Sequence, residues 1–234
     1  LPRIHGFELM MAPYTIAHLK LSMAFKKTGF TYFLDRLGIY LTNSLQDTQI
    51  QHTMNAFGLA ESIAKESEVA EEIKTKSPIM IVVGNPPYSG ESPNQGKQFQ
   101  QISKLMEDYK KEPGGEVKLN ERNPKWLNDD YVKFMRFGQH FIERNESGIV
   151  AYINPHGFLD NPTFRGMRWN LLKTYDKIYV LNLHGNAKKK EVSPDGSKDE
   201  NVFDIQQGVS INILVKTGKK APNELGQIYY TDVW

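Results

Sequence analysis

Short, continuous apolar runs alternate with longer helix-forming stretches along this chain, and that alternation is what most restricts its fold. The clearest run, residues 79–83, is largely β-branched and stops at Gly84-Asn85-Pro86-Pro87. A run without polar alternation is typical of a strand buried on both faces of a parallel sheet. We therefore predict an α/β sheet with helices on both faces. Further strands are predicted at 4–7, 39–41, 149–153 and 178–181, and helices at 12–23, 59–74, 131–141 and 164–171.

One later apolar segment has a different pattern. Between residues 209 and 215, apolar side chains at odd positions alternate with Ser210, Asn212 and Leu214. A period of two is typical of a strand with one less buried face, which is often antiparallel. We therefore expect a Rossmann-like sheet that is mostly parallel and has an antiparallel last strand. The domain is expected to span residues 1–218, with residues 219–234 beginning a linker or a following region.

Two long polar segments interrupt the alternation. Residues 89–125 are rich in Gln, Lys, Glu and Gly, and we expect them to be mobile until a substrate enters and orders them. Residues 186–208 contain Lys188-Lys189-Lys190, which could contact phosphate. Because four acidic residues follow within ten positions and oppose that charge, a solvated loop is the preferred interpretation.

Composition limits the possible partners. The 29 basic and 27 acidic residues give a formal net charge of +2, so any grip on DNA phosphates must come from a local patch or from other domains. Disulfides and thiolate metal sites are excluded because there is no cysteine. His5, His156 and His184 lack the spacing of metal ligands, so no metal is expected. No apolar run is long enough to span a membrane, and we expect a cytoplasmic protein.

The turn Gly84-Asn85-Pro86-Pro87-Tyr88 follows the strongest predicted strand, at the place where open α/β sheets bind ligands. The prolines fix φ and remove two N–H donors, so the Asn85 side-chain oxygen and the Pro86 carbonyl can face one site as paired acceptors. Two acceptors suit an exocyclic amine, because holding its hydrogens frees the nitrogen lone pair to attack a methyl group. Tyr88 could stack on the flat ring that carries this amine. The alternative is a strand-ending turn without chemistry.

The tetrapeptide Asn85-Pro86-Pro87-Tyr88 is the Asn-Pro-Pro-Tyr motif of methyltransferases that act on adenine N6 in DNA. Its surroundings resemble the γ class of these enzymes. More specifically, the chain resembles the methylase region of large single-chain restriction–modification enzymes, which fuse nuclease, helicase, methyltransferase and target-recognition regions. The segments that carry this resemblance are 4–9, 12–14, 41–45, 161–168 and 202–208.

The resemblance implies transfer of a methyl group from S-adenosylmethionine to N6 of an adenine flipped out of double-stranded DNA. The tetrapeptide at 85–88 would be catalytic. Glu8 matches the acidic residue that binds the ribose hydroxyls of the donor, although a helix-entry carboxylate is an equal alternative without the family. Asn43 stands where the family often has an aspartate that reads the donor's adenine. Phe203 would form a second wall for the target base, or would anchor its loop to the core.

The same family begins with a strand and a glycine-rich loop that holds the methionine half of the donor, and no such segment is found here. We therefore expect a sheet without its first strand, starting at the family's second strand, with a gap or a substituted strand between 4–7 and 79–83. The 234-residue chain alone is expected to be inactive and to bind S-adenosylmethionine weakly or not at all. An upstream segment and a target-recognition domain of the same parent chain are the expected partners.

Other functions stay open at this stage. The chain could be a catalytically incomplete nucleic-acid-binding or scaffolding module that keeps the methyltransferase fold, although an intact Asn85-Pro86-Pro87-Tyr88 favours an enzyme. It could also methylate RNA or protein glutamine, which related Asn-Pro-Pro-Tyr sites serve; the flanking segments favour DNA.

Overall fold

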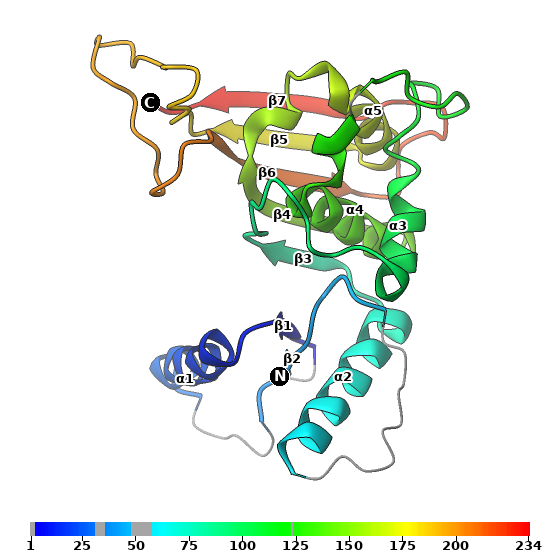
Figure 1. Ribbon diagram of the computed structural model, residues 1–234, viewed down its shortest axis with the longest axis vertical. Helices are drawn as coiled ribbons and strands as arrows, with labels where there is room; N and C mark the ends of the chain where they lie inside the picture. The colour runs from blue at the N-terminus through cyan, green and yellow to red at the C-terminus, as the bar shows by residue number, and fades with distance from the viewer. Residues whose placement is uncertain (1–2, 31–35, 48–57, 123) are drawn as a thin grey trace. The chain divides into compact units, whose positions relative to one another are not determined.

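The computed structural model of the protein describes residues 3–30, 36–47, 58–122 and 124–234. The chain forms two compact units, Leu1–Ser77 and Pro78–Trp234. The first contains a two-stranded sheet and the second a five-stranded sheet (Figure 1). The gap or substituted strand expected between 4–7 and 79–83 would join elements of the two units and stays a prediction.

In the first unit, two short parallel strands are each followed by a helix, as the sequence predicts. β1 (Gly6–Glu8) precedes α1 (Met11–Lys27), and β2 (Ile39–Leu41) precedes α2 (Leu59–Lys76). The carboxylate of Glu66 on α2 joins these elements. It accepts hydrogen bonds from the Tyr14 hydroxyl at 2.8 Å, the Leu41 N–H at 2.7 Å and the Arg36 guanidinium at 2.6 Å. A partly buried carboxylate with three donors is well satisfied and fixes both helices to β2.

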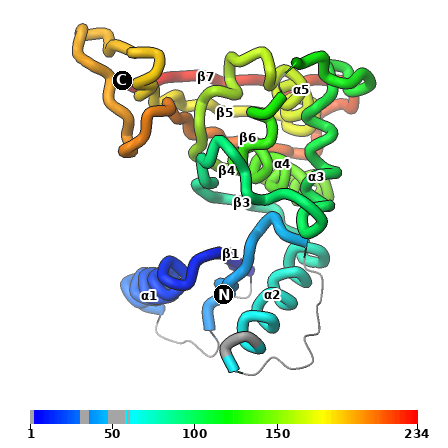
Figure 2. The backbone as a smooth tube through the Cα atoms, in the orientation of Figure 1, coloured from blue at the N-terminus to red at the C-terminus, as the bar shows by residue number. Residues whose placement is uncertain are grey.

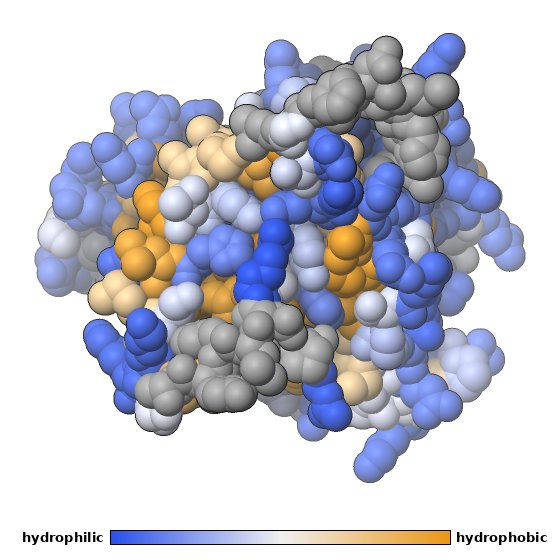
Figure 3. All heavy atoms as spheres, turned by 90° about the horizontal axis from the view of Figure 1, so that it is seen from below, coloured by the Kyte–Doolittle hydropathy of each residue, from blue (hydrophilic) through white to orange (hydrophobic). Residues whose placement is uncertain are grey.

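Among the described residues of its unit, α1 is largely exposed. Ile16, Leu19 and Met23, which the 3.6-residue spacing places on one face, are all exposed, and no residue of α1 is buried. Hydrophobic side chains are visible at the surface in the space-filling view (Figure 3). The sequence correctly predicts this helix, whereas burial of its apolar residues is not observed in the described part of the unit.

The second unit contains a mixed sheet with the strand order β3-β4-β6-β5-β7. β6 is antiparallel to both β4 and β5, which confirms the prediction for residues 209–215. Residues 219–234 do not lie apart from the domain, because β7 pairs in parallel with β5 along its whole length. The strands are β3 (Ile81–Gly84), β4 (Gly148–Pro155), β5 (Lys177–Asn182), β6 (Val209–Lys216) and β7 (Gln227–Asp232).

The helices of this unit all lie on one face of the sheet (Figure 1). These are α3 (Gln100–Met106), α4 (Asp130–Glu143) and α5 (Arg165–Thr174). On the other face, Ile81 and Val83 of the edge strand β3 are 65% and 75% exposed. The expectation that β3 is covered on both faces is therefore wrong within this unit, because none of its helices crosses to that side.

The expectation of a mobile loop at 89–125 is also wrong, because much of this segment is part of the core. It forms a short 3-10 helix (Lys97–Phe99), α3, and the start of another 3-10 helix (Pro124–Asn128). Phe99, Ile102, Met106 and Tyr109 are buried. These residues recur at helical spacing, a signal that the polar composition of the segment hides.

A buried polar network joins the three helices. The Gln139 amide of α4 accepts a hydrogen bond from the Tyr109 hydroxyl at 2.7 Å and donates to Asn170 and Thr174 of α5 at 2.5 and 2.6 Å. One turn away, the Arg136 guanidinium donates to Asp108 and Glu143, both at 2.9 Å. Since a buried polar group is costly unless it is satisfied, this network fixes the helices to one another.

Candidate functional site

The Asn85-Pro86-Pro87-Tyr88 turn begins directly after β3, at the edge where the parallel strands β3, β4, β5 and β7 all end (Figure 1). The loop between β5 and β6 lies at this same edge, as does the end of β7 (Figure 2). This is the edge at which open α/β sheets bind ligands. The structure thus places the predicted turn and the loop that carries Phe203 at the same edge of the sheet, where the parallel strands end.

Within the turn, Asn85 is exposed, Pro86 is buried and Tyr88 is half-buried. The Tyr88 hydroxyl donates a hydrogen bond to the Asn85 side-chain oxygen and also lies 3.0 Å from the carbonyl oxygen of Ile153 on β4. Burial raises the pKa of the Tyr88 hydroxyl to about 12, so this group stays protonated at neutral pH. The turn therefore presents an acceptor that a neutral hydroxyl holds in place.

Glycine allows the strand before the turn to pack closely on Tyr152 of β4. A Cβ atom at Gly84 would lie 3.1 Å from Cε1 of that ring, and a Cβ atom at Gly138 of α4 would lie 3.1 Å from its hydroxyl oxygen. The Tyr152 side chain is buried between the two glycines. This packing fixes the end of β3, and with it the starting point of the turn.

The chain that follows Tyr88 is held by two adjacent carboxylates at the start of α4. Asp130 accepts hydrogen bonds from Ser89 at 3.1 Å, from the Asn94 side chain at 2.9 Å and from Ser92. Asp129 accepts from the N–H of Gly90 at 3.2 Å. Neither carboxylate caps α4, although their sequence position indicates a helix start.

Burial raises the pKa of Asp129, and its partners are mainly backbone groups. A lysine completes the cluster, since Lys133 Nζ donates to Ser92 Oγ at 2.7 Å and to the carbonyl oxygen of Asn94 at 2.6 Å.

Sequence reasoning missed these residues because their partners lie 36 to 41 positions away. The pair Asp129-Asp130 directly before an apolar helix is the available signal, and such a pair is equally typical of a simple helix start.

In the first unit, Glu8 and Asn43 lie at the carboxyl ends of the paired strands β1 and β2. One oxygen of Glu8 accepts hydrogen bonds from the N–H groups of Leu9 and Met10 at 2.9 and 3.0 Å. The other oxygen has no partner among the residues that the structure describes. The side-chain oxygen of Asn43 accepts from the N–H of Leu45 at 3.0 Å, which shapes the turn after β2.

Phe203 lies in an ordered loop at the carboxyl edge of the second unit and is 37% exposed. The loop is held from within: Asn201 donates to the carbonyl oxygens of Gly185 and Gln207 at 3.0 and 2.7 Å. Phe203 is thus partly covered and partly exposed, and its role as a wall for the target base or as an anchor of the loop stays a prediction. Lys188, Lys189 and Lys190 are exposed, in agreement with a solvated loop.

None of the described helices combines the length and the apolar composition that a membrane span needs. The described residues also include no group of three or more His, Cys, Asp or Glu side chains placed to hold a metal ion.

The sequence pattern of the Eco57I restriction-modification methylase family matches residues 3–188. The chain belongs to this family. The matched span contains Glu8, Asn43 and the whole 85–88 turn, whereas Phe203, β6 and β7 lie beyond it.

Solved structures agree with membership of the Eco57I family. The chain is similar to the ATP-dependent Type ISP restriction-modification enzyme LlaBIII bound to DNA, with 25% identity and a TM-score of 0.74. It is similar to DrdV in a DrdV–DNA complex, with 25% identity and a TM-score of 0.72. A nuclease-deletion mutant of the Type ISP enzyme LlaGI, in complex with a DNA substrate mimic, shares the fold at 20% identity and a TM-score of 0.70.

The alignments with LlaBIII, DrdV and LlaGI cover 97%, 98% and 98% of this chain, but only 15%, 21% and 18% of the solved chains. Comparison with curated proteins gives no match. The likeness confirms the predicted α/β methyltransferase-type fold of restriction–modification enzymes.

Proposed function

We propose that this Eco57I-family chain transfers a methyl group from S-adenosylmethionine to N6 of an adenine flipped out of double-stranded DNA. The observation that carries the proposal is the exposed Asn85 acceptor at the carboxyl edge of the sheet, followed in the same turn by buried Pro86 and half-buried Tyr88. This combination offers hydrogen-bond acceptors next to an aromatic ring, as a flat base with an exocyclic amine requires.

In this proposal, the Asn85 side-chain oxygen and the Pro86 carbonyl accept the two N6 hydrogens. Held in this way, the nitrogen becomes more tetrahedral and its lone pair is free to attack. The gain is orientational and electrostatic, and no covalent enzyme intermediate is needed. Tyr88 is not the base that removes the final proton, because its hydroxyl is already protonated at neutral pH, with a pKa of about 12.

The substrate base must leave the duplex, which costs a few kcal/mol. Stacking on the Tyr88 ring offsets part of that cost, since a base on an aromatic side chain contributes about 1–3 kcal/mol. Phe203 is proposed as the second wall, because it is partly exposed in a loop at the same edge of the sheet (Figure 2). Entry of the base must also replace the Tyr88–Asn85 hydrogen bond.

The residues of the first unit suit part of the methyl donor. The Glu8 oxygen that has no partner among the described residues can accept hydrogen bonds from a ribose diol while the other oxygen stays on the helix-entry amides. Asn43, at the end of the neighbouring strand, is proposed to face the adenine of the donor. When bound, S-adenosylmethionine supplies an electrophilic methyl group on a sulfonium. Glu8 and Asn43 together account for the adenosine half only.

Double-stranded DNA is the proposed partner, because the solved enzymes LlaBIII and DrdV were studied as DNA complexes. Because the net charge of the chain is only +2, we propose that other domains contribute to binding the DNA phosphates, as in a multidomain restriction–modification enzyme of the cytoplasm.

The test is to identify the methylated product. The full-length natural protein is incubated with DNA and S-adenosylmethionine that carries a labelled methyl group, and the DNA is then digested to nucleosides. The proposal predicts label in N6-methyldeoxyadenosine. Label in N4-methyldeoxycytidine, or transfer to RNA or protein but not to DNA, would contradict it.

A non-enzymatic scaffolding role is the second candidate function. DNA binding without methyl transfer at any donor concentration would favour this role.

A further inference from the structure

The loop that connects β5 to β6 carries Phe203, and its two ends leave the sheet at one place. The N–H of Leu183 donates to the carbonyl oxygen of Val209 at 2.9 Å, and the N–H of Val209 donates to that of His184 at 3.1 Å. The backbone then turns away from the sheet at His184 and Gly185, whose φ angles are 51° and 76°. The base of the loop is therefore narrow and closed by backbone hydrogen bonds.

The imidazole of His156 lies against both ends of this loop. His156 directly follows β4, and its N–H donates to the carbonyl oxygen of Gly208, on the returning end, at 2.9 Å. A Cβ atom at Gly208 would overlap Cε1 and Nε2 of the ring, so glycine is what lets the imidazole lie there. On the leaving end, the side-chain nitrogen of Asn186 lies 3.2 Å from Nε2. His156 thus contacts residues 186 and 208 at once.

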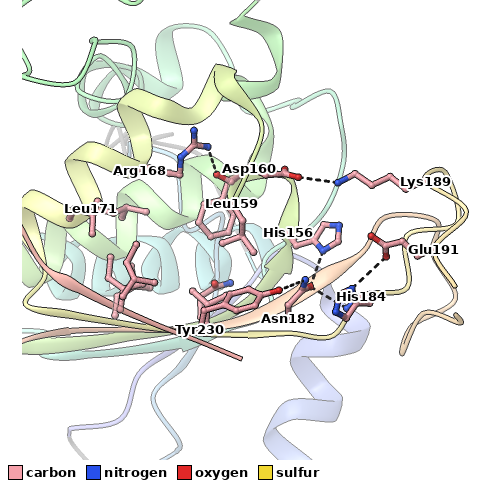
Figure 4. A pocket seen from close by; sticks show the side chains of 17 residues that line it. His156, Leu159, Asp160, Arg168, Leu171, Asn182, His184, Lys189, Glu191 and Tyr230 are labelled. Carbon is pink, nitrogen blue, oxygen red and sulfur yellow. Dashed lines mark hydrogen bonds and ion pairs between the residues drawn. The ribbon is translucent and has the colours of Figure 1, made fainter. Parts of the chain in front are cut away.

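Backbone N–H groups fix which nitrogen of His156 carries the proton. The side-chain oxygen of Asn182 accepts the N–H of His184 at 3.2 Å and lies 2.9 Å from Nδ1 of His156 (Figure 4). The side-chain oxygen of Asn186 accepts the N–H of Lys189 at 3.1 Å, so it is the nitrogen of this amide that faces Nε2. Nδ1 therefore donates to Asn182, and Nε2 accepts from Asn186. These three side chains, His156, Asn182 and Asn186, form the loop clasp.

Hydrogen bonds, more than packing, hold the His156 ring in place. The ring lines a cavity of about 570 Å³ that lies between α5 and the strands β5, β6 and β7 (Figure 4). A ring beside a cavity has few packing contacts on that side. Loss of the hydrogen bond to Asn186 would therefore loosen the ring as well as the loop.

A second set of hydrogen bonds connects the clasped loop ends to Phe203. The side-chain nitrogen of Asn201 donates to the carbonyl oxygens of Gly185 and Gln207 at 3.0 and 2.7 Å, each one position from a residue that the clasp contacts. The side-chain oxygen of Asn201 accepts the N–H of Phe203 at 2.8 Å. Phe203 is therefore joined, through one side chain, to both of the loop ends that His156 holds.

We propose that His156 is a positioning residue for the target base. It holds both ends of the loop, and the loop holds Phe203 at the carboxyl edge of the sheet as the second wall of the base site. This inference rests on the proposed function. The His156 ring is buried and both of its nitrogens are already bonded, so it does not act on the reacting atoms itself. The clasp serves capture of the flipped adenine and not binding of the methyl donor.

Asn186→Ala opens the clasp from the loop side, at a half-buried position outside the core. In the full-length natural protein, it is expected to lower kcat/KM for DNA about fivefold, because one hydrogen bond is lost. The Kd of S-adenosylmethionine is expected to stay within about twofold. Asp195→Ala is the matched control, since it removes the acceptor of the Ser197 N–H in the same loop, as Asn186→Ala removes that of Lys189. The control is expected to keep kcat/KM within about twofold of wild type.

Amide hydrogen exchange gives a readout that does not depend on methyl transfer. Exchange of the Phe203 N–H is expected to become at least about threefold faster in Asn186→Ala, because its acceptor Asn201 loses the support of the clasp. Exchange of the β4 and β6 amides is expected to stay at the wild-type rate, which checks that the variant is folded. Unchanged exchange at Phe203 would overturn the inference.

Combination with Phe203→Ala distinguishes positioning from a general loss of structure. Phe203→Ala alone is expected to lower kcat/KM for DNA about tenfold, since a stacking wall is lost. In that background, Asn186→Ala is expected to change kcat/KM less than about twofold, because the side chain that it displaces is absent. A full fivefold loss in the Phe203→Ala background, or no loss from one of the two single substitutions, would overturn the inference. Absence of methyl transfer to DNA by the wild-type protein would instead contradict the proposed function, and the inference with it.

Discussion

The hydroxyl of Tyr88 donates a hydrogen bond to the side-chain oxygen of Asn85, three residues earlier in the same turn. The carbonyl oxygen of Ile153 lies 3.0 Å from the same hydroxyl, which has only one proton to share between the two acceptors. In the proposed reaction, the Asn85 oxygen must leave this bond and accept an N6 hydrogen instead. The hydroxyl can then donate fully to Ile153. Tyr88 therefore has two separable parts: a ring that stacks and a hydroxyl that holds the acceptor.

Tyr88→Ala and Tyr88→Phe separate those two parts. Loss of the ring is expected to weaken binding of DNA that contains an extrahelical adenine by about 1–3 kcal/mol, or roughly 5- to 150-fold. Tyr88→Phe keeps the ring and is expected to bind such DNA within a few-fold of wild type. Fluorescence of 2-aminopurine at the target position reports the flipped base. Equal losses in both variants would show that stacking is not the role of Tyr88.

Asp130→Ala tests the carboxylate that holds the chain after Tyr88. The substitution leaves Ser89, Ser92 and the Asn94 amide without their acceptor, and it is expected to cost about 1–3 kcal/mol in the free energy of unfolding. Amide hydrogen exchange should also become faster at Gly90 and Asn94. Asp204→Ala, an exposed aspartate in the loop at 186–208, is the matched control and should change neither quantity. Unchanged exchange in Asp130→Ala would remove Asp130 from the positioning role.

Gly84→Ala tests the packing before the turn. The added methyl group would lie 3.1 Å from the buried Tyr152 ring, so β3 must shift by a few tenths of an ångström. We expect a loss of about 1 kcal/mol in stability and a fall of about tenfold in methyl transfer, because transfer is sensitive to small displacements. Gly157→Ala is the control, since a methyl group there meets no atom within 4 Å. Full transfer activity in Gly84→Ala would contradict the account of this packing.

The ion pair between Glu112 and Arg165 sets a pH dependence. Hydrogen bonds from Arg165, and then from the Asn120 N–H, lower the pKa of Glu112 to about 2. A carboxyl group whose pKa is lower in the folded state stabilises that state above its unfolded pKa, and the contribution is lost as pH falls through the folded pKa. Wild type is therefore expected to be more stable than Glu112→Gln at pH 6, with the difference shrinking toward pH 2. Urea unfolding at several pH values measures it; a constant difference would contradict the prediction.

The sequence predicts most of the sheet, because each predicted strand has a local signal; β7 (Gln227–Asp232) is the strand that the sequence analysis does not predict. Residues 79–83 and 149–153 are continuous apolar runs, and residues 209–215 have the period-two pattern of the antiparallel β6. The Asn85 turn is likewise a contiguous motif. Asp129 and Asp130 could not be assigned in this way, since their partners Gly90 and Ser89 are distant in sequence and meet them only after folding.

Burial was harder to predict than strand type. An apolar run indicates that a strand can be buried, but not which helices cover it, and Val83 is 75% exposed in its unit. In residues 89–125 the apolar positions are few, and their helical spacing is visible only once the polar residues between them are ignored. The cavity under α5 is lined by residues of α5 and of the strands β5, β6 and β7, which are distant in sequence, so no local pattern predicts it.

The most direct test of the central claim is single-turnover methyl transfer by Asn85→Ala in the full-length natural protein, with the product identified as N6-methyldeoxyadenosine. Removing one acceptor that acts in the transition state is expected to slow transfer by on the order of 10²–10³-fold. Because the Asn85 side chain is exposed and outside the core, the variant should keep the wild-type melting temperature, and it should bind DNA and S-adenosylmethionine within a few-fold. Transfer by Asn85→Ala at a near wild-type rate would contradict the assignment of this turn as the site of the reaction.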